Sequence, residues 1–232
     1  MLVRRLAEPA VSAAYNSGSM TPAPLDATLS CRSKTSSSVP SKRSAQRCTG
    51  FRLDQLLVDA DAVAACCGVG RHALLFAEHG FAVEAIDGAP AGLDFACREA
   101  AARGLRLSLR QADADALPFA DQSFDYVLSW NVIFHGSLGD VGRRLAEIWR
   151  ILKPGGLYQG TMLSKRDVQF GRGRPVAPDT FIRGGDAKAH PHYYCDLAGL
   201  AALFAGFELL SLTQEEQRHP GSWHWHILAE RR

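Results

Sequence analysis

A regular alternation of short apolar runs and longer amphipathic stretches begins near residue 62 and limits the choice of fold more than any other feature. Strand-like and helix-like segments in this order predict βαβ units, in which right-handed crossover helices join parallel strands. The expected strands are 62–66, 82–86, 105–110, 124–130, 157–162, 207–213 and 223–230, and the expected helices are 71–79, 91–103 and 141–152. We therefore expect an α/β domain built on a largely parallel sheet.

The last two expected strands depart from this pattern. Only residues 214–222, which include Pro220 and Gly221, separate strand 207–213 from strand 223–230. Nine residues are too few for a crossover helix, so these two strands must pair antiparallel. A parallel sheet that ends in an antiparallel hairpin is not the usual dinucleotide-binding arrangement, which narrows the choice of fold.

The first fifty residues differ in composition from the rest of the chain. They contain ten serines and carry a net charge of +5, whereas the remaining residues carry a net charge of −3. A segment so poor in large apolar residues is expected to be disordered, and its Arg-rich, Ser-rich and acid-poor composition is also typical of an organelle transit peptide. We expect a tail at residues 1–50 and one globular domain at 51–232, located in the cytoplasm or, if the tail is a transit peptide, in an organelle.

Composition also excludes several classes of function. The mildly acidic domain lacks the basic surface charge of a nucleic-acid-binding protein. No apolar run approaches the roughly 20 residues that a membrane-spanning helix needs. The six cysteines form no Cys-x-x-Cys pair, which argues against a zinc ribbon or a thioredoxin-type redox site.

Residues with ligand-binding chemistry follow three successive strands. A glycine-containing turn with Gly68 and Gly70 lies between a predicted strand and a predicted helix, where the backbone can approach a ligand closely. Asp87 ends the next strand, where a carboxylate can accept from both hydroxyls of a ribose. Asp113 ends the third strand and could accept from the exocyclic amine of a purine. Together these positions predict a bound nucleoside.

Several motifs in this order resemble the class I S-adenosylmethionine-dependent methyltransferases. The resemblance covers residues 62–232 and is based on four segments: 67–72 (CGVGRH), 85–87 (AID), 113–127, which contains LPF and FDYV, and 147–156 (EIWRILKPGG). It implies a Rossmann-like, doubly wound sheet of seven strands, mostly parallel, with an antiparallel C-terminal hairpin. It also implies S-adenosylmethionine as cofactor and methyl transfer to a small-molecule acceptor.

The resemblance further implies a set of cofactor-binding residues. Among them, Asp87 would hold the ribose and Asp113 would contact the adenine. The full set is Cys67, Gly68, Gly70, Asp87, Gly88, Asp113, Ala114, Trp130 and Asn131.

Two positions depart from the pattern of this family. Ala64 stands where the family usually has an acid, and Cys66 replaces the first glycine of the turn. A degenerate domain that binds cofactor without turnover is therefore an alternative. A nicotinamide-dependent oxidoreductase is a further alternative, because Gly68-x-Gly70-x-x-Ala73 also fits a dinucleotide-binding turn.

Candidate acceptor-side residues lie after the fourth predicted strand and in a long segment, 163–196, which we expect to be a loop. His135, His192 and Tyr193 are the candidates for contact with the acceptor, and a base among them would help if the acceptor carries a proton. An alternative role for His135 is a hydrogen bond to backbone at a helix start. The basic residues of 163–196 could receive an acidic group, although they could equally be a solvated surface.

Histidines are concentrated near the end of the chain. His224 and His226 share one face of a predicted strand and, with His192, could bind a metal. No acidic or cysteine ligand lies at a recognisable spacing from them, so an acceptor pocket lined by aromatic and imidazole groups is favoured. We assign no metal ligand from the sequence.

Overall fold

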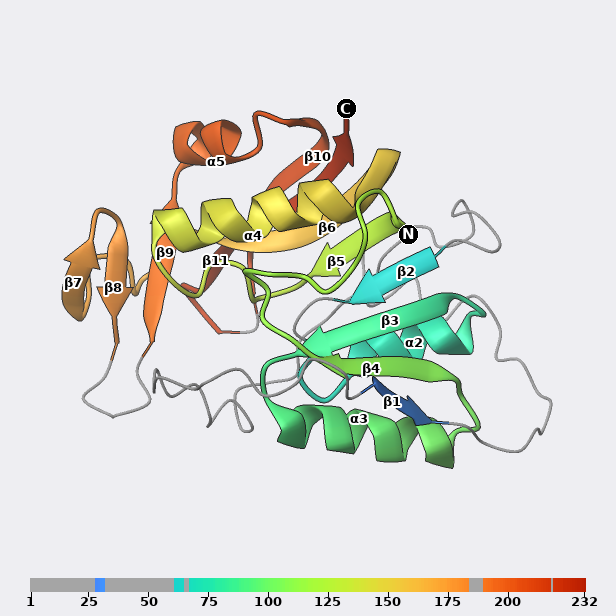
Figure 1. The fold of residues 1–232 in the computed structure, drawn as a ribbon. Helices are drawn as coiled ribbons and strands as arrows, with labels where there is room; N and C mark the ends of the chain where they lie inside the picture. Colours follow the sequence, from blue (N-terminus) through green and yellow to red (C-terminus); the bar gives the residue numbers. More distant parts are fainter. Residues whose placement is uncertain (1–27, 32–60, 65–66, 184–189, 218) are drawn as a thin grey trace.

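The computed structural model describes residues 28–31, 61–64, 67–183, 190–217 and 219–232, and it shows a mixed sheet with helices packed against it (Figure 1). The strands are β1 (Thr28–Cys31), β2 (Asp61–Ala64), β3 (Ala82–Asp87), β4 (Leu107–Gln111), β5 (Phe124–Ser129), β6 (Leu152–Ser164), β7 (Arg174–Ala177), β8 (Thr180–Ile182), β9 (Pro191–Cys195), β10 (Phe207–Glu216) and β11 (Trp223–Arg231). The helices are α2 (Arg71–Glu78), α3 (Pro90–Ala102), α4 (Leu138–Ile151) and α5 (Leu197–Leu203).

The order in which the strands are added to the sheet reverses at its centre, between β2 and β5. The order is β1-β4-β3-β2-β5-β6-β9-β8-β7, and β11 pairs with both β6 and β10. Strand β2 is parallel to β3 on one side and to β5 on the other. The sequence therefore runs outward in opposite directions from β2 and β5, and ligands of open α/β sheets bind at the carboxyl ends of strands at such a point.

The C-terminal hairpin is confirmed. Strands β10 and β11 pair antiparallel, and β11 is also antiparallel to β6 over Leu157–Leu163. The sheet is therefore parallel from β4 to β6, and β6 pairs antiparallel with β11 and parallel with β9. Figure 1 shows α2 and α3 beside β3 and β4, with α4 running along β5 and β6.

The predicted count of seven strands is too low for the sheet as the structure has it, which contains eleven. The seven expected strands correspond to β2–β6, β10 and β11. Three of the others, β7, β8 and β9, lie in the segment 163–196 that we expected to be a loop. The frequent glycines and charged residues of this segment are typical of a loop, and its apolar runs Phe181–Ile182 and Tyr193–Tyr194 are short. These runs form strands because they pair with residues distant in the sequence.

The remaining additional strand lies in the expected tail. Strand β1 pairs antiparallel with β4, from Thr28 opposite Arg110 to Cys31 opposite Leu107. Without it β4 would be an edge strand with unpaired backbone groups, and a short extended segment satisfies them. Residues 28–31 of the expected tail thus form a strand of the sheet, while the rest of 1–50 lies outside the described residues.

Helix α4 is positioned by its first turn. Ser137 and Asp140 form a capping box, in which each side chain binds the backbone N–H of the other residue. The face with Val141, Leu145 and Ile148 is buried against the sheet, and the opposite face is charged. None of the described helices combines the length and apolar character needed to cross a membrane.

Candidate functional site

The glycine turn joins β2 to α2 at the centre of the sheet. Gly68 and Gly70 have φ angles of 51° and 74°, in the left-handed region that favours glycine. The N–H of Gly70 donates to the carbonyl of Cys67 at 2.8 Å, and α2 begins at the next residue. Cys67 itself is buried and donates from its N–H to the carbonyl of Ile86 at 2.6 Å. The turn thus presents its backbone at the carboxyl edge of the sheet.

Asp87 ties the end of β3 to this turn. Its Oδ2 accepts from the N–H of Gly68 at 2.6 Å, and its Oδ1 accepts from the N–H of Ala89 at 2.8 Å. Gly88, which lies between Asp87 and Ala89, is exposed, and its carbonyl accepts a hydrogen bond from Nε2 of Gln111. One carboxylate therefore fixes the turns that follow two neighbouring parallel strands.

Gly92, a functional candidate that the sequence interpretation missed, packs against the same turn. A Cβ at Gly92 would lie 2.7 Å from the carbonyl oxygen of Gly68, and one at Gly70 would lie 2.6 Å from Cβ of Ala96. Helix α3 can approach the turn because Gly92 and Ala96 are small and lie four residues apart on one face. This spacing was the signal present in the sequence.

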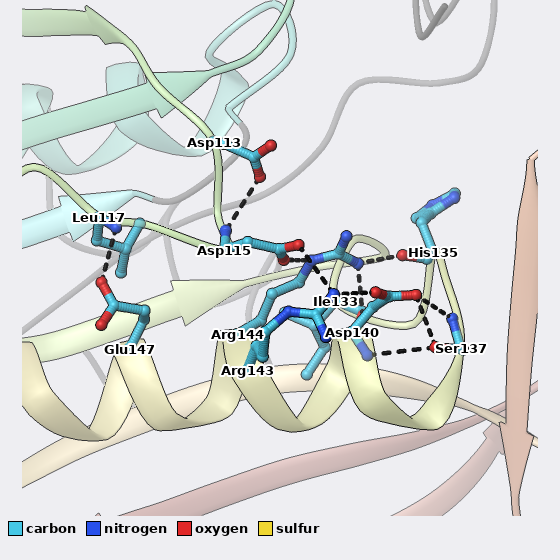
Figure 2. Close-up of polar contacts among 10 residues, drawn as sticks. All are labelled: Asp113, Asp115, Leu117, Ile133, His135, Ser137, Asp140, Arg143, Arg144 and Glu147. Atoms are coloured by element: carbon cyan, nitrogen blue, oxygen red, sulfur yellow. Dashed lines mark hydrogen bonds and ion pairs between the residues drawn. The ribbon is translucent and has the colours of Figure 1, made fainter. Parts of the chain in front are cut away.

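The loop after β4 carries Asp113 and is held by α4 (Figure 2). Asp113 accepts from the N–H of Asp115 at 3.0 Å through Oδ1, and Ala114 is buried beside it. The N–H of Leu117 donates to Glu147 of α4 at 2.8 Å. The position of the Asp113 carboxylate therefore depends on contacts made one helix away.

Arg144 on α4 connects the loop after β4 with the loop after β5. Its Nε donates to Oδ1 of Asp115 at 2.6 Å, and its Nη1 donates to the carbonyls of Ile133 and His135 (Figure 2). Its side chain is only 11% exposed, compared with 59% for the neighbouring Arg143. Arg144 thus holds together the segments that carry the candidate purine contact and the candidate acceptor contact.

We expect Glu147→Gln to remove a pH-dependent part of the stability. Hydrogen bonds from Arg150 and from the N–H of Leu117 outweigh burial and lower the pKa of Glu147 below its usual 4.5. A lowered pKa stabilises the fold above pH 4.5 and ceases to do so as pH falls through the folded-state pKa. The deficit of the variant relative to wild type should therefore be largest near neutral pH and shrink in acid.

Urea denaturation at about pH 7 and about pH 3.5 measures this difference. Glu99→Gln is the matched control, because the pair of Glu99 with Arg103 is exposed and contributes little. A deficit of Glu147→Gln that stays constant across this range would contradict the assignment.

Three histidine rings lie together next to the loop after β5. The ring centroids of His135, His190 and His192 are 4.4 to 4.9 Å apart. Burial and the neighbouring His192 and His190 lower the pKa of His135 well below its usual range. Burial and the charge of Arg183 lower the pKa of His192 to about 3. These lowered pKa values favour the neutral forms of His135 and His192 at physiological pH.

Of the three predicted acceptor-side residues, the structure brings His135 and His192 together and places Tyr193 elsewhere. Backbone pairing joins the loop after β5 to β9, with the N–H of Tyr193 donating to the carbonyl of Phe134 at 2.9 Å. Side chains alternate along a strand, so Tyr193 points away from His192 and its hydroxyl approaches Gly199. Burial raises the pKa of Tyr193 to about 12. His135 also makes the hydrogen bond to backbone considered as its alternative role, from Nε2 to the carbonyl of Asn131.

The candidate cofactor residues Trp130 and Asn131 are directed toward β6 and β11. The buried ring of Trp130 meets His226 edge-on at 4.8 Å between centroids. Asn131 adopts a φ of 56°, and its carboxamide binds Thr161 and Gln217. In these positions both side chains fix the first residues of the segment that follows β5.

His224 and His226 do not join the cluster of three histidines. His224 lies on β11 with its ring centroid 5.9 Å from that of Phe134, while His226 faces Trp130. The triplet of His192, His224 and His226 considered from the sequence is therefore replaced by His135, His190 and His192, whose ligand atoms all lie within 4.8 Å of one another.

Comparison with known proteins agrees with this arrangement. A family profile described as "Methyltransferase domain" matches residues 62–156, which span the glycine turn, Asp87, Asp113 and the start of β6. The demethylmenaquinone methyltransferase of Thermus thermophilus is 41% identical over 93 residues, which cover 38% of this chain and 40% of that protein. Residues 62–156 are therefore similar to S-adenosylmethionine-dependent methyltransferase domains. The chain spans about two fifths of the length of the curated relatives it matches first.

Solved structures share the fold of this chain. A SAM-dependent methyltransferase from Methanosarcina mazei superposes with a TM-score of 0.65 at 20% identity, covering 77% of this chain and 95% of that chain. The 1,6-didemethyltoxoflavin-N1-methyltransferase of Burkholderia thailandensis, solved with 1,6-didemethyltoxoflavin and S-adenosylhomocysteine, has a TM-score of 0.60 at 18% identity, over 82% and 79% of the two chains. Ala64 is the last residue of β2, whereas the expected strand ended at Cys66, which lies outside the described residues.

Proposed function

We propose that the protein transfers the methyl group of S-adenosylmethionine to a small-molecule acceptor. The observation that carries this proposal is the contact between Asp87 and the glycine turn, at the point of the sheet where the strand order reverses. This contact brings together a backbone turn that a ligand can approach and a carboxylate that can accept hydrogen bonds from the same ligand.

Asp87 is proposed to bind the ribose while it orders the turn. Each carboxylate oxygen has more than one lone-pair direction, and the N–H groups of Gly68 and Ala89 use one on each oxygen. The remaining lone pair on each oxygen can accept a hydrogen bond from one of the two ribose hydroxyls. Because Asp87 itself orders the turn, the absence of an acid at Ala64 need not abolish binding.

The adenine is proposed to lie against the loop after β4. Asp113 could accept from the exocyclic amine, and Ala114 contributes a buried apolar side chain next to it. Glu147 and Arg144 would act as positioning residues, since both hold this loop from α4. Cys67, Gly68, Gly70 and Gly88 would line the remainder of the cofactor.

The reaction itself would be an in-line displacement. When bound, the cofactor would supply an activated methyl group: the acceptor atom would form a bond to the methyl carbon as the carbon–sulfur bond breaks, S-adenosylhomocysteine would leave as a neutral thioether, and any proton on the acceptor atom would pass to solvent. Alignment and exclusion of water can supply roughly 7–11 kcal/mol of the barrier reduction in such a reaction. His135 and His192 are proposed to face the acceptor, because both are partly buried at the carboxyl edge of the sheet and their lowered pKa values favour the neutral form.

A small molecule is the proposed acceptor class because the relatives act on small molecules. The names of the Thermus and Burkholderia proteins specify demethylmenaquinone and 1,6-didemethyltoxoflavin as their acceptors. The second candidate function is cofactor binding without turnover, motivated by Ala64 and Cys66.

An assay of S-adenosylhomocysteine release tests the proposal. The full chain is incubated with S-adenosylmethionine and a panel of quinols, phenols, amines and thiols. Acceptor-dependent release that is lost with Asp87→Ala is the expected result. Tight cofactor binding with no release on any acceptor would favour the binding domain, and absence of both would contradict the proposal.

A further inference from the structure

Three imidazoles from two separate segments converge at the carboxyl edge of the sheet. His135 follows β5, whereas His190 and His192 lie at the start of β9. One ligand atom from each residue lies within 4.8 Å of those of the other two. We propose that His135, His190 and His192 form a site for one divalent transition-metal ion, such as Zn²⁺.

The ligand chemistry selects the class of ion. The group consists of imidazoles alone among the described residues, and imidazole suits Zn²⁺, Co²⁺, Ni²⁺ and Cu²⁺, whereas Mg²⁺ and Ca²⁺ prefer oxygen. The three rings are partly buried, and an imidazole binds a metal through the lone pair of one ring nitrogen. Three protein ligands leave a fourth tetrahedral position for a further ligand.

His135 is already oriented as a metal-binding histidine would be. Its Nε2 lies 3.2 Å from the carbonyl oxygen of Asn131, which can only accept, so Nε2 carries the hydrogen. Nδ1 is therefore left with its lone pair. Metal-binding histidines commonly donate their second N–H to a backbone carbonyl in this way.

The backbone holds the two contributing segments in register. The N–H of Gly136 donates to the carbonyl of Pro191 at 2.8 Å, and His135 and His192 form an antiparallel bridge. In a tetrahedral zinc site the ligand nitrogens are about 3.4 Å apart, so closure around an ion needs ring movements of about 1 Å. Side-chain rotation alone can supply such a movement.

The surrounding charges indicate what the fourth ligand would be. Arg144 is balanced by Asp115 at 2.6 Å, while the charge of Arg183 acts on His192. A cation next to Arg183 is favoured when its open position holds an anionic or ionisable group, such as a phenolate or thiolate. The site goes beyond the proposed function and does not depend on it, since a metal can bind whether or not a methyl group is transferred.

Metal titration of the full, tag-free chain tests this proposal. Protein stripped with a chelator is titrated with Co²⁺, followed by visible absorption, and Zn²⁺ is then added as competitor. We expect one equivalent of Co²⁺ with the bands of tetrahedral coordination, displaced by Zn²⁺. His135→Gln and His192→Gln should each weaken binding by roughly a hundredfold or more.

His219→Gln is the matched control, because His219 is exposed and outside the cluster. It should bind Co²⁺ as wild type does, and the metal-free melting temperatures of all variants establish that they are folded. Binding that survives both cluster substitutions, or that is absent from folded wild-type protein, would overturn the proposal.

Discussion

Replacing Asp87 with alanine should weaken the binding of S-adenosylmethionine by roughly 10- to 100-fold. The substitution removes the acceptor of the Gly68 and Ala89 N–H groups and the proposed ribose contact. Hydrogen bonds to a charged group contribute about 1.5–3 kcal/mol each, and about 1.4 kcal/mol corresponds to tenfold in affinity. Calorimetric titration of the variant with S-adenosylmethionine measures the loss.

Two further variants make this result specific. Asp94→Ala changes an exposed carboxylate on α3 and should leave the affinity within about twofold of wild type. Asp87→Asn keeps one acceptor oxygen, so its affinity should be intermediate. An affinity of Asp87→Ala equal to that of Asp94→Ala would show that Asp87 does not hold the cofactor.

Replacing Arg144 with alanine should lower the free energy of unfolding by roughly 2–4 kcal/mol. The change leaves the Asp115 carboxylate and the carbonyls of Ile133 and His135 without their donor, in a place where the arginine side chain is only 11% exposed. Because both loops lose their common anchor, binding of S-adenosylmethionine should also weaken. Urea denaturation and cofactor titration measure the two effects.

The neighbouring arginine provides the control. Arg143 pairs with Asp140 and Asp115, but its side chain is 59% exposed, so Arg143→Ala should cost less than about 1 kcal/mol. Equal losses for Arg143→Ala and Arg144→Ala would contradict the anchoring role. A loss of stability with unchanged cofactor affinity would show that Arg144 supports the fold without positioning the site.

The central architecture could be predicted because it is encoded in local patterns. Parallel strands such as β3 and β5 are mostly apolar, and the short connection from β10 to β11 allows only antiparallel pairing. Gly68, Gly70 and Asp87 occur at fixed positions relative to these strands, so they could be recognised before the fold was seen.

The acceptor side could not be predicted because it is assembled by distant pairing. Strand β9 is stabilised by β6 on one side and by the residues after β5, and no local pattern indicates that His135 lies against His192. The role of Arg144 could not be predicted either, because the sequence pattern places it on the charged, exposed face of an amphipathic helix. Its contacts to two loops appear only when α4 is placed across them.

Calorimetric titration of the full chain with S-adenosylmethionine, S-adenosylhomocysteine and NADH is the most direct measurement of the central proposal. We predict that both adenosyl ligands bind to one site per chain in the micromolar range, that they compete with each other, and that NADH does not bind. Binding of NADH alone, or of none of the three, would contradict the assignment of the glycine turn and Asp87 as an S-adenosylmethionine site.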